Sequence, residues 1–255
     1  MSRRIIDLHA HLSHDMPHEP KNTPLNRSDL AFIFQQYQRA GIICGGFSTF
    51  ESFYSVESIC DENHYLHTIS KSKDDVFQWV VIDPRQEQTF AQAETFLSHP
   101  SCLGIKIHPY MHQYNTMEYA EMLFSFAEKH KTFILTHPDS PELLSGLVPF
   151  ADKYPNAKLI IAHLGSVEHI EAVYLAKNHN IFVDTSGIAS SKNNIIEYAV
   201  SRIGSKNIFF GTDSYSAAFQ RGRIEFSGIS ELDKENIFIN NAMREFSQFH
   251  SMPIC

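Results

Sequence analysis

Short apolar runs rich in β-branched residues recur along the chain, and segments with apolar residues at helical spacing lie between them. The apolar runs predict eight strands: Ile5–His9, Ile42–Thr49, Phe77–Asp83, Leu103–His108, Thr132–His137, Leu159–His163, Ile181–Asp184 and Ile208–Thr212. The other segments predict eight helices: Ser28–Arg39, Ser55–Ser70, Glu87–Leu97, Met117–His130, Pro141–Lys153, Val167–Asn178, Asn194–Ile203 and Lys234–Phe249. This alternation is typical of βαβ units in a parallel sheet.

The number of these units favours a closed barrel. Eight strand–helix units in 255 residues match an α/β fold of the (β/α)8 TIM-like barrel type. An open doubly wound sheet is the alternative, but no G-x-G-x-x-G motif follows the first strand. No linker-like or low-complexity stretch interrupts the pattern, so we expect a single domain over residues 1–255.

Two longer segments follow strands one and eight. We expect Leu12–Arg27 and Ser214–Ser230 to be loops that leave the carboxyl ends of their strands. Barrel active sites are built at that end, and long loops there are candidates for lids or for substrate-binding segments.

Polar residues end the first predicted strand. Side chains alternate between the two faces of a strand, so His9 and His11 point the same way. Two imidazoles on one face can hold a single metal ion. An H-x-H pair alone is only moderately specific, because two surface histidines would give the same pattern.

The same kind of ending recurs on other strands. His108, His137, His163 and Asp213 end strands four, five, six and eight, and Lys106 shares a face with His108. A buried polar group costs free energy unless it has a partner, and a metal ion shared at the rim would be that partner. Three imidazoles with one carboxylate suit Zn²⁺ first, with Mn²⁺, Fe²⁺ or Co²⁺ as alternatives.

Composition narrows the class of protein. The formal net charge of −8 argues against a nucleic-acid-binding surface. The apolar run at the start of the chain is interrupted by Asp7 and His9, so it predicts neither a signal peptide nor a membrane span. None of the 4 cysteines forms a C-x-x-C pair, which favours a reduced, cytoplasmic chain. The 15 histidines point to metal or acid–base chemistry.

The motifs at the strand ends, taken in order, resemble those of the amidohydrolase superfamily: Asp7–His11 (D-x-H-x-H), Gly104–Pro109 (G-I-K-I-H-P), Thr136–Pro138 (T-H-P), Ala162–Gly165 (A-H-L-G) and Gly211–Asp213 (G-T-D). The chain is most similar to the amidohydrolase-related (amidohydrolase 2) branch. That branch includes enzymes like aminocarboxymuconate-semialdehyde decarboxylase, pyrone-dicarboxylate lactonase and aromatic-acid decarboxylases. The likeness runs nearly end to end and also includes Phe182–Gly187 (F-V-D-T-S-G). These motifs are specific for the superfamily and poorly specific for reaction or substrate.

Carried over residue by residue, the resemblance implies that His9, His11, His137 and Asp213 are metal ligands. His163 would be the catalytic histidine, and Asp213 would also be catalytic, taking a proton and passing it to a leaving group. A metal ion lowers the pKa of bound water towards neutrality, which agrees with this assignment.

Three residues are candidates for substrate binding. Some superfamily members carboxylate a lysine on strand four and use it to bridge two metal ions, but single-metal sites predominate in the branch that this chain resembles. We therefore expect one ion per chain, with Lys106 and His108 facing the substrate. An ion pair inside the barrel is the alternative role for Lys106. Arg221, after strand eight, could hold a substrate carboxylate with two hydrogen bonds, or be a solvated loop residue.

The leading hypothesis for function is metal-dependent hydrolysis of an amide, lactone or other ester-like bond in a small molecule. The alternative is non-oxidative decarboxylation of an aromatic or unsaturated carboxylic acid, with the same metal ligands. A TatD-like nuclease is disfavoured by the negative charge and by Lys106, because TatD-like chains carry a glutamate there. A non-catalytic relative is disfavoured because all four ligands are present. We expect no nucleic-acid or membrane partner, and the resemblance suggests a homo-oligomer.

Overall fold

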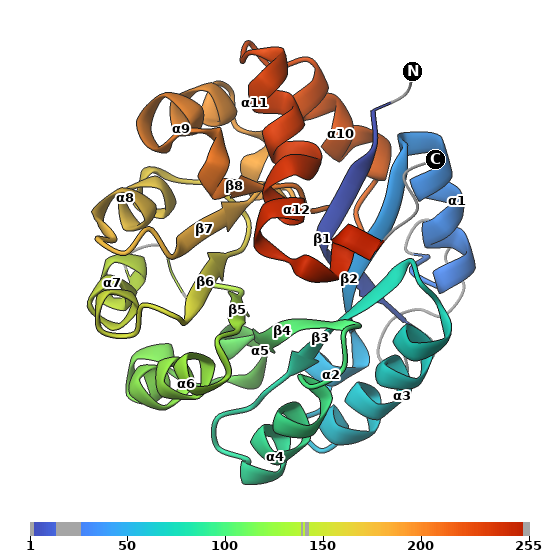
Figure 1. Ribbon diagram of the computed structural model, residues 1–255, viewed down its shortest axis with the longest axis vertical. Helices are drawn as coiled ribbons and strands as arrows, with labels where there is room; N and C mark the ends of the chain where they lie inside the picture. Colours follow the sequence, from blue (N-terminus) through green and yellow to red (C-terminus); the bar gives the residue numbers. More distant parts are fainter. Residues whose placement is uncertain (1–2, 14–26, 139, 141–142, 252–255) are drawn as a thin grey trace.

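The computed structural model describes residues 3–13, 27–138, 140 and 143–251. Eight strands form one parallel sheet: β1 (Ile5–Leu12), β2 (Ile42–Thr49), β3 (Val76–Val81), β4 (Cys102–Ile107), β5 (Phe133–Thr136), β6 (Lys158–Ile161), β7 (Ile181–Asp184) and β8 (Ile208–Phe209). The sheet closes because the Leu8 N–H in β1 donates to the Phe210 carbonyl, just after β8, at 2.9 Å. The predicted (β/α)8 barrel is confirmed (Figure 1).

Helices surround the ring of strands (Figure 1). They are α1 (Leu30–Ala40), α2 (Glu51–Tyr54), α3 (Ile59–Ser72), α4 (Glu87–Phe96), α5 (Pro109–His112), α6 (Thr116–His130), α7 (Leu144–Lys153), α8 (Val167–Leu175), α9 (Ile195–Ile203), α10 (Ala217–Glu225), α11 (Glu231–Glu235) and α12 (Asn241–Glu245). The short helices α2 and α5, which begin at the ends of β2 and β4, were not predicted. Among the described residues, no helix combines the length and apolar character that crossing a membrane requires.

The barrel interior is filled by aromatic and aliphatic side chains at the starts of the strands. Phe77, Phe133 and Phe182 belong to this buried cluster, and Phe246 and Phe249 from the C-terminal segment join it. The Phe246 ring stacks on that of Phe133, with centroids 4.3 Å apart. The C-terminal segment therefore covers the amino end of the barrel with apolar side chains. The polar residues that end the strands lie at the opposite, carboxyl end.

The last helix differs from the continuous helix predicted over Lys234–Phe249. It is divided into α11, a π-helical turn over Asn236–Asn240, and α12. The Ile237 carbonyl accepts a hydrogen bond from the Phe210 N–H at 3.1 Å, so it is drawn towards the end of β8. A π turn inserts one extra residue into the helix, and such turns are rare enough that spacing alone does not predict them.

The two long segments also turn out differently from the prediction. Ser214–Ser230 is not a loop throughout, since it contains α10, whose N-cap Ser216 accepts from the Phe219 N–H. Its sequence has a weak apolar pattern and an internal Gly222, which hid the helix. Most of Leu12–Arg27, the other candidate for a lid or a substrate-binding segment, lies outside the described residues.

Candidate metal centre and active site

The two histidines of β1 come together as predicted. The strand runs on to Leu12, so both His9 and His11 lie within it and share the interior face. Their side chains are almost fully buried, and the two Nε2 atoms are 3.1 Å apart. Ligands bound at 2.0–2.1 Å to one ion, the usual zinc–imidazole distance, are compatible with that separation.

Asp213 reaches the same place from the end of β8. Its backbone lies in the left-handed region, with φ of +58°, and its N–H donates to the His9 carbonyl at 2.7 Å. This turn brings Asp213 Oδ1 to 3.0 Å from His11 Nε2 and 3.7 Å from His9 Nε2. The three side chains form a group whose ligand atoms all lie close enough for one metal ion.

The protonation states of this group suit a divalent ion. The His9 Nδ1–H donates to the Asp184 carboxylate at 2.8 Å, so the lone pair of His9 is on Nε2 and faces the centre. Burial lowers the pKa of His9 to about 3 and also lowers that of His11, so both rings are neutral, as metal ligands must be. Burial opposes ionisation of Asp213, but the His11 contact and the nearby imidazoles hold its pKa well below the usual range. Neutral imidazoles and a carboxylate that converge in a buried site therefore fit a divalent metal ion.

His137 stands beside this group rather than within it. Its Nδ1–H donates to the Pro138 carbonyl at 3.0 Å, which leaves Nε2 with the lone pair. The His137 ring lies 4.8 Å from that of His163 and stacks on His108 with centroids 4.3 Å apart. Among the described residues, two groups of three have metal-binding spacing: the one above and a second formed by His9, His163 and Asp184. His137 belongs to neither. Its role as a ligand stays a prediction.

His163, the predicted catalytic histidine, lies next to the metal-binding group. It follows β6 with φ of +63°, a left-handed conformation that is uncommon for residues other than glycine. Its ring centroid is 5.1 Å from that of His9, and its Nδ1 is 2.9 Å from Ser186 Oγ. Strained backbone at both His163 and Asp213 is the kind of feature that concentrates at functional sites.

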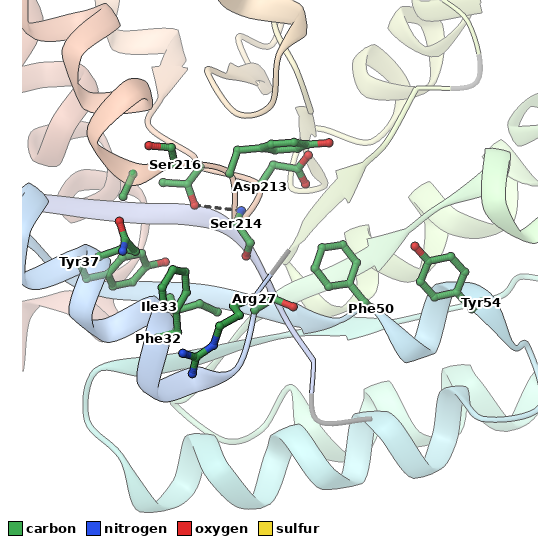
Figure 2. A pocket seen from close by; sticks show the side chains of 14 residues that line it. Arg27, Phe32, Ile33, Tyr37, Phe50, Tyr54, Asp213, Ser214 and Ser216 are labelled. Atoms are coloured by element: carbon green, nitrogen blue, oxygen red, sulfur yellow. Dashed lines mark hydrogen bonds between the residues drawn. The ribbon is translucent and has the colours of Figure 1, made fainter. Parts of the chain in front are cut away.

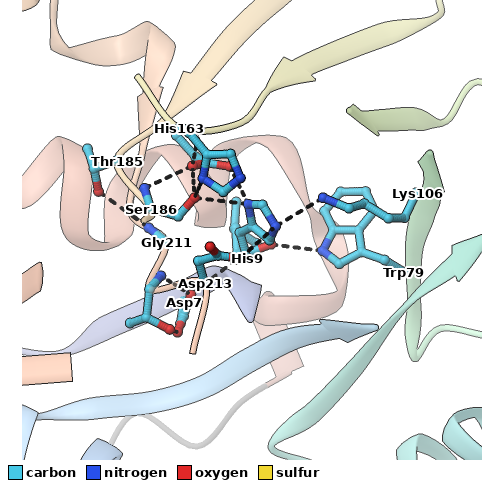
Figure 3. Close-up of polar contacts among 12 residues, drawn as sticks. Asp7, His9, Trp79, Lys106, His163, Thr185, Ser186, Gly211 and Asp213 are labelled. Carbon is cyan, nitrogen blue, oxygen red and sulfur yellow. Dashed lines mark hydrogen bonds and ion pairs between the residues drawn. The ribbon is translucent and has the colours of Figure 1, made fainter. Parts of the chain in front are cut away.

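Of the three predicted substrate contacts, Lys106 and His108 reach the site. Lys106 is fully buried, and its Nζ lies 3.0 Å from His9 Nε2, so an ion bound to that nitrogen would displace this contact (Figure 3). Burial lowers the pKa of Lys106 to about 8. The Phe53 ring lies near both, with its centroid 4.8 Å from that of His108 and 5.9 Å from Lys106 Nζ.

Arg221 is the predicted contact that the structure does not bring to this site. Its guanidinium donates to the Ala40 carbonyl at 2.9 Å and pairs with Glu225 at 3.3 Å. Arg221 therefore joins α10 to the end of α1. The prediction failed because the segment after β8 is helical, and the turn of α10 decides where its side chains point.

Two polar residues at the end of β7 have contacts that sequence reasoning missed. Asp184 and Ser186 are both fully buried and contact His9 and His163. The signal was present, because Phe182–Gly187 ends strand seven with polar residues as the other strands do, but we assigned no role to it.

Two cavities open on either side of Asp213 and Tyr215. One, of about 380 Å³, is lined by His137, His163 and Lys192 as well as by these two residues. The other, of about 400 Å³, is lined chiefly by α1, the start of α10 and aromatic residues that follow β2 (Figure 2). Each has the size of a small-molecule site. The first contains the candidate catalytic histidine.

Gly187 leaves room for the catalytic pair. Its φ is +69°, and an added Cβ would lie 2.8 Å from His163 Nδ1 and 3.4 Å from Asp213 Oδ2. We expect Gly187→Ala to displace His163 and to reduce kcat about 10²-fold. Gly204→Ala is the matched control, because Gly204 has a similar φ of +73° and nothing within 4 Å of its added Cβ. Equal kcat in the two variants would show that the crowding of His163 is unimportant.

A model of the amidohydrolase 2 family, described as Amidohydrolase, matches residues 6–247. The chain belongs to this family. The family assignment made from the strand-end motifs is thereby confirmed. No curated protein matches this amidohydrolase by sequence.

Solved structures with the same fold include several decarboxylases. Dihydroxybenzoic acid decarboxylase from Polaromonas sp. JS666 has a TM-score of 0.77 and 15% identity, over 97% of this chain and 98% of that one. 2,6-Dihydroxybenzoate decarboxylase from Rhizobium has a TM-score of 0.75 and 16% identity, over 95% and 98%. 4-Oxalomesaconate hydratase from Rhodopseudomonas palustris has a TM-score of 0.69 and 14% identity, over 97% of each chain. At these identities the likeness shows the fold.

Proposed function

We propose that this amidohydrolase is a metal-dependent lyase that removes the carboxyl group of a small aromatic or unsaturated carboxylic acid as CO₂. The observation that carries the proposal is the cavity of about 380 Å³ beside the metal-binding group. Its wall combines His163, a proton carrier, with the Lys192 ammonium, which favours an anionic substrate. A cavity of this size accepts a substrate with a single ring.

His9, His11 and Asp213 would hold the ion, and His137 would complete the set after a small adjustment. When bound, a divalent ion supplies positive charge that orients substrate oxygens and stabilises negative charge on them. Zn²⁺ and Mn²⁺ both accept imidazole and carboxylate ligands. We propose one ion per chain.

The chain's own residues supply the proton chemistry. Decarboxylation breaks the bond between the carboxyl carbon and the substrate, CO₂ leaves, and the electron pair stays on the substrate carbon, which then takes a proton. The His163 imidazole borders the cavity and can deliver that proton. The Asp213 carboxylate lines the same cavity and supplies negative charge beside the His163 ring. Lys106 and His108, from the end of β4, contact His9 and His137.

Hydrolysis, the leading hypothesis from sequence, is the second candidate. The same Asp213 and His163 could activate and orient a water molecule, so the local geometry serves both reactions. Decarboxylation is supported better because decarboxylases are frequent among the structural neighbours, including one described with bound manganese and the inhibitor 2-nitroresorcinol. That ligand is an aromatic compound of a size that suits the cavity.

Metal removal tests the proposal directly. We expect purified protein to contain about one divalent ion per chain, measured by elemental analysis, and to release CO₂ from one or more members of a panel of hydroxybenzoic and unsaturated acids. Treatment with a chelator should abolish CO₂ release, and Mn²⁺ or Zn²⁺ should restore it, because the proposed reaction needs the positive charge of a divalent ion held by His9, His11 and Asp213. Cleavage of ester or lactone substrates without any CO₂ release would favour hydrolysis instead. CO₂ release that survives complete metal removal would contradict both reactions.

A further inference from the structure

We infer that Asp184 and Ser186, at the end of β7, form a positioning pair that sets the tautomer and orientation of His9 and His163 together. The inference rests on the proposed metal site and deepens it, because one of these histidines is a candidate ligand and the other the candidate proton carrier. Figure 3 shows His9 with Ser186 and His163 on one side and Lys106 on the other. Neither Asp184 nor Ser186 is in the predicted ligand set.

The Asp184 carboxylate uses both of its oxygens in this arrangement. Oδ2 accepts from the His9 Nδ1–H at 2.8 Å. Oδ1 accepts from the backbone N–H of His163 at 3.1 Å, from the backbone N–H of Ser186 at 2.9 Å, and from the Ser186 hydroxyl. Three donors converge on Oδ1, so that oxygen is fully used, and Oδ2 is held by the His9 ring.

The orientation of the His9 ring decides between two roles for Asp184. His9, His163 and Asp184 have spacing that could itself hold a metal ion, as an alternative to the group with His11 and Asp213. However, His9 faces Asp184 with Nδ1, which carries the ring proton, and faces His11 and Asp213 with the Nε2 lone pair. An ion shared by His9 and Asp184 would therefore have to replace the His9 Nδ1–H bond, or the hydrogen bonds that converge on Oδ1. Asp184 therefore acts on the ion through His9, as carboxylates behind metal-binding histidines do.

The Ser186 hydroxyl carries the effect to the second histidine. It has a single proton, which it donates to Asp184 Oδ1. Its lone pairs are then left to accept, and His163 Nδ1 lies 2.9 Å away, so His163 must carry its proton on Nδ1. His9 Nδ1 lies 3.0 Å from the same oxygen, but its single proton is held mainly by Asp184 at 2.8 Å. Asp184 and Ser186 together therefore leave both Nε2 lone pairs available at the site.

The electrostatic setting is consistent with this role. Asp184 is fully buried, and within the described residues its only ion-pair contact is His9, with no lysine or arginine within 4 Å. A buried carboxylate without a cationic partner is costly. Positive charge on the far side of the His9 ring would offset that cost, from the Lys106 ammonium 3.0 Å from His9 Nε2 or from a divalent ion when one is bound.

Nitrogen spectra of the metal-free protein test the tautomers directly. In ¹⁵N-histidine-labelled protein, we expect long-range ¹H–¹⁵N correlations to show His9 and His163 with Nδ1 protonated. Ser186→Ala should convert His163 to a mixture of tautomers and leave His137 unchanged, because the Pro138 carbonyl holds that ring. Protonation of His163 on Nε2 in the unmodified protein would overturn the inference.

Metal affinity gives a second readout that needs no substrate. We expect Asp184→Asn to weaken Mn²⁺ or Zn²⁺ binding about 10- to 100-fold in chelator competition, without changing the stoichiometry. Ser190→Ala is the control, since Ser190 is equally buried but donates to the Thr185 carbonyl at 2.6 Å and touches neither histidine. A lost ion in Asp184→Asn would make Asp184 a direct ligand, and unchanged affinity would remove its role; either result overturns the inference.

These experiments separate the inference from the proposed reaction. If the tautomers and affinities change as expected but no acid releases CO₂, the positioning pair stands and the decarboxylase proposal falls. If CO₂ is released but Asp184→Asn and Ser186→Ala behave like Ser190→Ala, the decarboxylase proposal stands and the positioning pair falls.

Discussion

Asp213→Asn is expected to lower kcat about 10³-fold or more and to weaken metal binding at the same time. The substitution keeps the shape of the side chain but removes its negative charge. Asp213 Oδ1 lies 3.0 Å from His11 Nε2, and the amide would place either a neutral oxygen or an N–H group there. Either orientation removes the anionic ligand and the group that would stabilise a protonated His163.

Two measurements distinguish this result from loss of fold. Metal content by elemental analysis should fall together with kcat, while the free energy of unfolding of the metal-free protein should stay close to that of the unmodified protein. Asp233→Asn is a matched control, because Asp233 accepts from Ser205 and Ser230 at α11 and has no contact with the site. Full activity in Asp213→Asn would exclude Asp213 from both of its proposed roles.

The residues that meet at the metal centre could be predicted because side chains two positions apart in a strand point to the same face. His9 and His11 are two apart in one strand, so their common face follows from the pleat. Asp213 and His163 follow other strands of a parallel sheet, whose carboxyl ends share one rim. The positions of these four residues therefore follow from local strand patterns and the barrel topology, without knowledge of any specific long-range contact.

The positioning pair could not be predicted in the same way. The role of Asp184 depends on its contact with His9, which is 175 positions away in the sequence, and on the closure of the barrel that brings β7 near β1. The pattern marks Asp184 as polar at a strand end, but only the packed structure shows which imidazole it holds. Arg221 illustrates the same limit. Its sequence position after β8 suggested a substrate contact, but in the folded chain Arg221 lies on α10 and donates to the Ala40 carbonyl.

Asp7→Ala is expected to lower the free energy of unfolding by about 4 kcal/mol, the largest stability effect that we predict. Asp7 is fully buried and accepts from the Tyr37 hydroxyl at 2.7 Å and the Thr212 hydroxyl at 2.6 Å. It also accepts from the backbone N–H groups of Thr212 at 3.0 Å and His9 at 3.1 Å. Alanine would leave the two hydroxyls and the His9 N–H buried without this acceptor, whereas the Thr212 N–H keeps the His9 carbonyl. Each buried group that loses its acceptor costs about 1–3 kcal/mol.

The same contacts tie the fold to the site, because Asp7 joins β1 to the segment that carries Asp213. Urea unfolding of the metal-free protein measures the effect without the contribution of a bound ion. Asp29→Ala provides the comparison: Asp29 caps α1 at the surface by accepting from the Phe32 N–H, and its loss should cost about 1 kcal/mol. If the two substitutions cost the same, Asp7 would be no more than an ordinary hydrogen-bond acceptor. If Asp7→Ala costs several times more and also weakens metal binding, the network that closes the barrel is also the one that aligns the metal centre.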